Sequence, residues 1–133
     1  MKKAKLTLVL IVLIMINACK PTYSSLAYDN ALKAKQDVLN TVELSINPYG
    51  DFVGKIDSLK LELNSYYTYE LERPNNKASV EIWKRLIKDK GVVTKFFELW
   101  KTLGVLRSKE VETSKKQIGL NFDQLIELEQ AKQ

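Results

Sequence analysis

Few residues in this sequence could do chemistry, and their types rule out the commonest reactive sites. The chain contains no histidine and a single cysteine, Cys19. Histidine is the usual general base and the usual metal ligand, so Ser–His, Cys–His and Glu-x-x-His sites cannot form. One cysteine makes neither an internal disulfide nor a thiolate zinc site. The glycines are scattered and form no phosphate-binding loop. We therefore expect a protein without catalytic residues, metal or cofactor.

The acidic residues offer no clear catalytic pair. Three pairs of glutamates stand two residues apart: Glu70 and Glu72, Glu110 and Glu112, Glu127 and Glu129. Residues two apart on a helix diverge by about 200°, so the members of each pair point away from each other. The last pair also lies near a chain end that we expect to fray. The sequence predicts solvated surface charge at all three pairs.

A tyrosine cluster, Tyr66, Tyr67 and Tyr69, is the most unusual feature of the composition. On a helix Tyr66 and Tyr69 share a face while Tyr67 lies about 100° away, so the three rings cannot all enter one core. One interpretation is that the rings close an end of the fold, with a hydroxyl in water. The other is a surface that binds a ligand, a glycan or a partner. The remaining large aromatics have helical spacing and are predicted core residues: Trp83, Phe96, Phe97 and Trp100.

Basic residues gather at Lys84, Arg85, Lys88 and Lys90. A solvated helix face explains them most simply, and contact with anionic lipid headgroups is the alternative. We expect no nucleic-acid partner, because the N-terminal residues described next predict an exported protein.

The N-terminus has the pattern of an export signal. Lys2, Lys3 and Lys5 precede an apolar run over residues 6–16, which only Thr7 interrupts. A basic head followed by an apolar run of about 7–15 residues describes a secretory signal peptide. A bilayer-spanning helix needs about 20 apolar residues, so this run is too short to be a permanent membrane anchor.

Ile16-Asn17-Ala18-Cys19 resembles the lipobox of bacterial lipoprotein precursors. The resemblance implies that Cys19 is acylated on sulfur and becomes the first residue of the mature chain. Lys20, which follows it, favours the outer membrane over the inner one by the enterobacterial sorting rule. Two or more acyl chains hold a protein stably on a bilayer. The expected organisation is a signal peptide over residues 1–18, a lipidated tether over 19–25 and a folded domain over 26–133.

The export signal also accounts for most of the basic charge. The chain has a formal net charge of +5, from 21 Lys and Arg residues against 16 Asp and Glu residues. Without Lys2, Lys3 and Lys5 the balance is 18 against 16. The charge of the mature domain therefore does not demand an anionic partner.

The elements that must position these residues are amphipathic helices. Apolar residues recur at steps of three and four over four segments, which predicts helices at about 24–46, 51–73, 77–103 and 107–131. In the first segment the stripe runs through Tyr28, Leu32, Lys35, Leu39, Val42 and Ile46, widened by Ala31 and Val38. Short connections between long helices favour antiparallel packing. We predict an all-α, up-down bundle of four to five helices.

Three glycines refine this prediction. Gly91 costs about 1 kcal/mol relative to alanine inside a helix, so the third segment is either one weakened helix or two helices, and we favour two. Gly104 is expected just after a helix end. Gly119 is expected to kink or break the last helix.

We predict a membrane-anchored envelope lipoprotein whose non-catalytic helical domain binds another protein or supports an envelope assembly. One alternative is a small-ligand or glycan binder that uses the tyrosine cluster. Another is an immunity, exclusion or inhibitor lipoprotein, which has the same architecture as the first. The sequence does not determine the oligomeric state.

Overall fold

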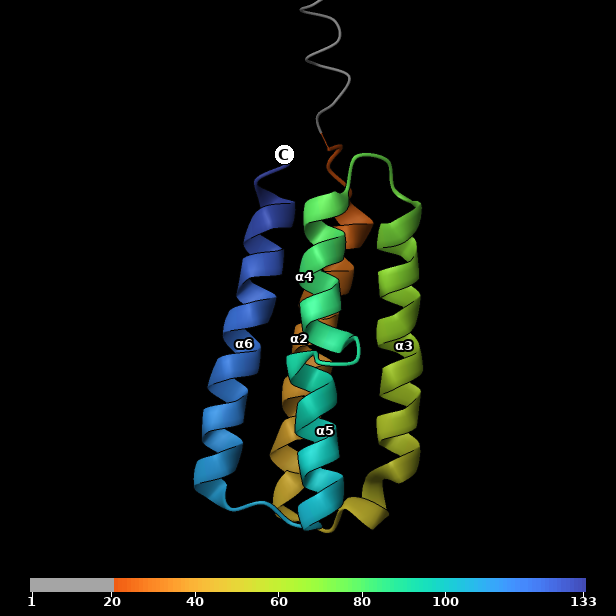
Figure 1. Cartoon of the computed structure of the whole chain (residues 1–133). Helices are drawn as coiled ribbons and strands as arrows, with labels where there is room; N and C mark the ends of the chain where they lie inside the picture. The colour runs from red at the N-terminus through yellow and green to blue at the C-terminus, as the bar shows by residue number, and fades with distance from the viewer. Residues whose placement is uncertain (1–20) are drawn as a thin grey trace, which may run out of the picture.

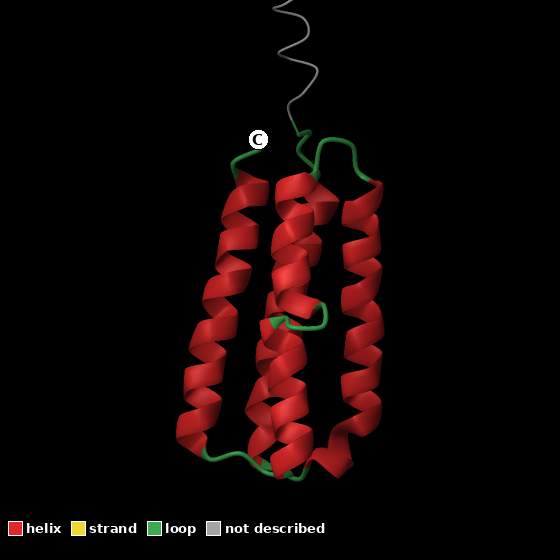
Figure 2. Ribbon diagram, in the orientation of Figure 1, coloured by secondary structure: helices red, strands yellow, loops and turns green. Residues whose placement is uncertain are grey.

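The computed structural model describes residues 21–133, so the predicted signal peptide and Cys19 lie outside the described residues. The elements are α2 (Ser25–Glu43), α3 (Val53–Glu72), α4 (Lys77–Ile87), α5 (Val92–Leu103) and α6 (Ser108–Gln130), with two 3₁₀ turns, η1 (Leu44–Ile46) and η2 (Tyr49–Phe52). This part of the chain contains no strand (Figure 2). The prediction of an all-α bundle is confirmed.

The helices form an up-down bundle in which α4 and α5 run in line as one broken helix (Figure 1). α2 packs against α3 and α6, and α4 packs against the same two helices. The N-terminal segment, the α3–α4 loop and the C-terminus meet at one end, which we call the entry end (residues 21–24, 73–76 and 131–133). The α2–α3 and α5–α6 connections meet at the opposite end, which we call the far end (residues 44–52 and 104–107).

The third predicted segment is two helices, separated by residues 88–91. The backbone at Gly91 has φ −66°, so the turn does not require a left-handed conformation. It requires space, because a Cβ atom at Gly91 would lie 2.5 Å from the Leu86 carbonyl oxygen. Thr94 closes the break by donating its hydroxyl to the Ile87 carbonyl at 2.7 Å. The predicted split is confirmed, and its cause is close backbone approach as well as low helix propensity.

The buried face of α2 differs from the predicted stripe. The fully buried apolar residues of this helix are Ala27, Ala31, Ala34, Val38 and Val42. Leu32 and Ile46, which the stripe placed in the core, are 41% and 53% exposed. The small alanine side chains allow the neighbouring helices to approach closely, which the larger residues would prevent.

Two further expectations concern α2 and α6. The Ser24 hydroxyl caps α2 by accepting the N–H of Ala27 at 3.1 Å. The expected kink at Gly119 is wrong, because α6 continues through it to Gln130. Gly119 is buried, and a Cβ there would meet Leu39 of α2 at 3.9 Å. This glycine therefore lies at a helix–helix contact and does not end the helix.

Aromatic residues fill the core as predicted. Trp83, Trp100, Phe97 and Phe96 are all buried. Trp83 meets Phe122 edge-on at 6.2 Å between ring centroids, and Trp100 meets Tyr49 edge-on at 5.4 Å. Edge-to-face pairs add about 0.5–1.5 kcal/mol beyond area burial. The two tryptophans thus tie α4 and α5 to different neighbours.

The far end is closed by backbone hydrogen bonds between its two connections. The Tyr49 N–H donates to the Gly104 carbonyl, and the Leu106 N–H donates to the Ser45 carbonyl, each at 2.8 Å. Gly104 has φ +78°, a conformation that favours glycine, and it follows the end of α5 as expected.

Candidate functional site

The three tyrosines of the predicted ligand surface lie on α3 but face different neighbours. Tyr66 is half-buried beside Trp83, and its hydroxyl donates to Glu62 at 2.7 Å. Partial burial, with this bond to Glu62, raises the pKa of Tyr66. The first of the three rings is therefore occupied by contacts within the bundle.

Tyr67 and Tyr69 are also engaged within the chain. Tyr67 is buried, and the Lys88 ammonium lies 4.2 Å from its ring centroid. The Tyr69 hydroxyl shares a 2.8 Å hydrogen bond with the Ser24 hydroxyl at the entry end. The three rings do not line a common cavity among the depressions described below. A ligand surface at Tyr66, Tyr67 and Tyr69 stays a prediction.

The predicted basic face is split by its contacts. Lys84 pairs with Glu81 at 2.9 Å, one turn before it on α4. Lys88 turns to α3, where it donates to the Asn64 side chain at 2.8 Å. Arg85 and Lys90 are exposed. The cluster therefore belongs mainly to the solvated surface of α4 and its contact with α3.

A buried polar network lies at the entry end, where α3 ends, α4 begins and α6 ends. Its members are Glu70, Arg73, Asn76, Ser79, Glu129 and Lys132. The side chains of Glu70 and Glu129 are 1% and 0% exposed, and that of Lys132 is 4% exposed. Charged groups are almost never buried to this degree without partners.

Arg73 joins both carboxylates of the buried polar network. Its Nη1 lies 2.9 Å from Glu70 Oε2 and 3.2 Å from Glu129 Oε2. Its Nη2 donates to the main-chain carbonyl of Thr22, in the segment that precedes α2. One guanidinium therefore connects α3, α6 and the N-terminal segment.

Lys132 joins the remaining members. Its ammonium donates to Asn76 Oδ1 at 2.8 Å, to Ser79 Oγ at 2.7 Å and to Glu129 Oε1 at 2.7 Å. Ser79 also donates to Glu129, and the Asn76 amide donates to Glu70. All three ammonium donors find acceptors, as a buried lysine requires.

The buried polar network contains two basic and two acidic side chains, but the pKa values of its two carboxyl groups are shifted in opposite directions. Burial raises the pKa of Glu70, and this effect outweighs its hydrogen bond from Asn76. Burial also acts on Glu129, but hydrogen bonds from Lys132 and Ser79 outweigh it and lower the pKa. Glu129 is thus the carboxyl group that the network holds more firmly in its charged form.

The expectation of solvated charge at Glu70 and Glu129 is wrong. Both residues occupy the last positions of apolar stripes, at the ends of α3 and α6, so helical periodicity directs them inward. The partners of Glu70 are local, and so is Lys132 beside Glu129. Glu129 also has distant partners, since Arg73 reaches it across 56 residues and Ser79 across 50. The position of each glutamate at the end of an apolar stripe was the signal that could have predicted its burial. The prediction of solvated charge considered only the direction of each glutamate relative to its nearest acidic neighbour.

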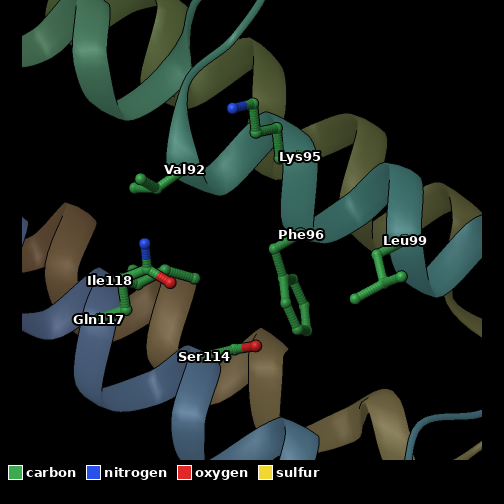
Figure 3. Close-up of a pocket in the computed structure, with 7 residues that line it drawn as sticks. All are labelled: Val92, Lys95, Phe96, Leu99, Ser114, Gln117 and Ile118. Atoms are coloured by element: carbon green, nitrogen blue, oxygen red, sulfur yellow. The ribbon is translucent and has the colours of Figure 1, made fainter.

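Two depressions lie between α5 and α6, which are joined at the far end (Figure 1). One depression of about 200 Å³ is lined by Val92, Lys95, Phe96, Leu99, Ser114, Gln117 and Ile118 (Figure 3). A second of about 480 Å³ adjoins it and is lined by Leu99, Arg107, Lys109, Glu110, Thr113 and Ser114. Leu99 and Ser114 belong to both, so we treat the two depressions as one feature, the α5–α6 groove.

The chemistry of the α5–α6 groove is apolar contact bordered by cations. Phe96 and Ile118 form its floor and are nearly fully buried, whereas Leu99 is 42% exposed. The one lining carboxylate, Glu110, accepts the Arg107 N–H at 2.9 Å and pairs with its guanidinium at 2.6 Å. Arg107 thereby lowers the pKa of Glu110. Such a groove offers binding surface, with no free base beside a nucleophile.

Within residues 21–133, none of the helices combines the length and apolar character needed to span a bilayer. Comparison with models of known protein families, with curated protein sequences and with solved structures finds no match.

Proposed function

We propose that this protein is a lipid-anchored lipoprotein of the bacterial cell envelope whose helical bundle binds a protein partner and catalyses no reaction. The anchor is the acylated Cys19 that the lipobox implies. The observation that carries the proposal is that the chain is already bonded to the bundle at Thr22, three positions after Cys19 in the sequence. α2 begins at Ser25, and Arg73 and Tyr69 bind the chain at Thr22 and Ser24. Little free chain therefore separates the anchor from the fold.

A short tether orients the bundle. Residues 19–21 span at most about 11 Å when extended, so the entry end must stay close to the bilayer surface. α6 contains 23 residues and is about 35 Å long. The far end, with the α5–α6 groove beside it, then stands away from the membrane. A surface in that position suits contact with a protein better than contact with lipid headgroups.

The anchor is tested by replacing its one reactive atom. Cys19→Ser should abolish incorporation of a labelled palmitate analogue and move the protein out of the membrane fraction, or leave the precursor uncleaved. Lys20→Asp is the matched control, because it keeps the acylated sulfur and should change only which membrane carries the protein. Palmitate labelling in Cys19→Ser at the level of the natural protein would contradict the proposal.

A further inference from the structure

We propose that the α5–α6 groove is the docking site for an acidic amphipathic helix of the partner protein. The proposal rests on the protein-binding role above and names the surface and the chemistry of the partner segment. It is argued from the shape, the exposed leucines and the charge of the groove.

The apolar surface of the groove has the spacing that a helix recognises. Leu99 lines both depressions and is 42% exposed. Leu103, one turn further along α5 and 54% exposed, lies outside both linings and extends the apolar surface. Phe96 lies beside Leu99 on α5, and Ile118 lies across the depression on α6, so an apolar side chain entering the groove meets carbon from both helices (Figure 3). Amphipathic helices dock into such grooves through residues at i, i+3, i+4 and i+7. The 12 residues of α5 extend about 18 Å, which matches some three turns of a partner helix.

The charge of the groove selects an acidic partner. Lys95 borders one depression and Lys109 borders the other, and both are exposed. Neither ammonium has a carboxylate partner among the described residues. The lining Glu110 is already occupied by Arg107. The groove therefore has one unpaired lysine at each depression, Lys95 on α5 and Lys109 on α6. Carboxylates flanking an apolar ridge would complement them.

A comparable depression elsewhere lacks this feature. The hollow at the α4–α5 break, about 220 Å³, is also apolar and bordered by the lysines Lys60 and Lys88. There the Lys60 ammonium lies 5.8 Å from the Phe97 ring centroid, and Lys88 lies 4.2 Å from that of Tyr67. Both ammonium groups therefore lie against aromatic rings of the same chain. The α5–α6 groove differs because Lys95 and Lys109 contact no carboxylate or aromatic ring among the described residues.

The test is site-specific photo-crosslinking in cells that make the full acylated protein from its own gene. A photoreactive residue replaces Thr113, which is exposed on the α6 side of the groove. The matched control places it at Leu61, 75% exposed on α3. We expect at least tenfold more protein adduct from position 113. Mass spectrometry should map the adduct to one segment of net negative charge with apolar residues at helical spacing.

Charge reversal tests the selectivity. Lys95→Glu with Lys109→Glu should lower the adduct yield at position 113 at least tenfold. Lys55→Glu with Lys77→Glu changes the net charge equally at exposed positions outside the groove and should leave the yield unchanged. Circular dichroism of both double variants confirms that each is folded.

Several outcomes would overturn the proposal: equal yields from positions 113 and 61, an adduct with a basic segment, with lipid or with a second copy of this chain, or no response to charge reversal. The outcomes also separate this proposal from the protein's proposed function. Protein adducts from position 61 alone would leave protein binding intact and reject the groove. A groove adduct on a chain that carries no acyl group would reject the anchor and keep the groove.

Discussion

At the residue scale, Glu129 is the side chain whose environment departs most from what its type suggests. It is fully buried and bonded to Lys132, Ser79 and Arg73. A buried ion pair adds little stability relative to an apolar replacement, but loss of one partner leaves the other charge buried and unpaired. The buried polar network should therefore be sensitive to single substitutions and should fix how α3, α4 and α6 meet.

Glu129→Gln should lower the free energy of unfolding at pH 7 by about 3–5 kcal/mol, because Lys132 loses its carboxylate. The pKa of Glu129 is lowered from the ordinary 4.5, so its charge contributes stability above that value and loses it as the pH falls. The difference in unfolding free energy between the natural protein and Glu129→Gln should therefore become smaller below pH 4.5. Urea unfolding followed by circular dichroism across pH measures this.

Glu70→Gln is the matched control for that pH dependence. The pKa of Glu70 is raised above 4.5, so this group contributes stability at low pH and loses it as the pH rises through its folded-state pKa. The loss of unfolding free energy in Glu70→Gln, relative to the natural protein, should therefore become larger as the pH falls. The corresponding loss in Glu129→Gln should become smaller. Equal pH dependence in the two variants would show that the carboxyl groups are not distinguished as described.

The two buried tryptophans provide a second prediction at this scale. Trp100 Nε1 donates to the Asn47 carbonyl at 3.0 Å, whereas Trp83 Nε1 has no hydrogen-bond partner among the described residues. Both substitutions to phenylalanine remove the same volume, but only Trp100→Phe loses a hydrogen bond, worth about 1 kcal/mol. Trp100→Phe should be the more destabilising by at least that amount in urea unfolding. A larger cost for Trp83→Phe would contradict these roles.

The buried polar network shows why the sequence did not predict the burial of Glu70 and Glu129. Helical periodicity can direct Glu70 and Glu129 inward, but it cannot supply the partners that make their burial tolerable. Arg73 and Lys132 are local partners, three residues after Glu70 and Glu129. The packing of α3 against α4 and of α4 against α6 joins these two pairs through Arg73–Glu129 and Ser79–Glu129. Lys132 is the hardest to anticipate, because it follows the end of α6 in a terminal turn.

At the element scale, the break between α4 and α5 depends on the space around Gly91. Gly91→Ala would place a Cβ 2.5 Å from the Leu86 carbonyl oxygen, and backbone cannot yield as a side chain can. We expect a loss of about 1–3 kcal/mol in the free energy of unfolding. Thermal unfolding of the purified protein measures it.

Gly54→Ala is the control for that substitution. Gly54 lies within α3, and a Cβ there meets nothing within 4 Å. Alanine in a helix is favoured over glycine by about 1 kcal/mol, so Gly54→Ala should raise the melting temperature. If both alanine variants are stabilised, the tight contact at Gly91 is not what separates the two helices.

The elements themselves were largely predictable, because apolar spacing and glycine position are local signals. The four amphipathic segments, the split at Gly91 and the end at Gly104 all follow from them. The buried face of α2 followed only in part: Ala31, Val38 and Val42 were predicted, but Ala27 and Ala34 were not, and Leu32 is exposed. The helix instead turns its alanines inward, where close packing rewards small size. The sequence also misassigned Gly119, because its role is set by its contact with Leu39 on α2.

At the scale of the whole molecule, the two ends of the bundle differ in chemistry. The entry end holds the buried side chains of Glu70, Glu129 and Lys132 with the partly exposed Arg73. The α5–α6 groove near the far end holds the exposed Leu99 and the unpaired Lys95 and Lys109. Residues 22 and 24 are bonded to the entry end. The anchor proposed at Cys19 would place the polar end at the membrane and the groove away from it, as the proposed binding role requires.

The most direct test of this account is the mass of the N-terminal peptide of the protein extracted from membranes. Lipidation at Cys19 predicts that this peptide begins at Cys19 and carries the added mass of a diacylglyceryl group on sulfur, with or without a further acyl chain on the amino group. An N-terminal peptide that begins elsewhere, or one that begins at Cys19 with a free thiol, would contradict the account.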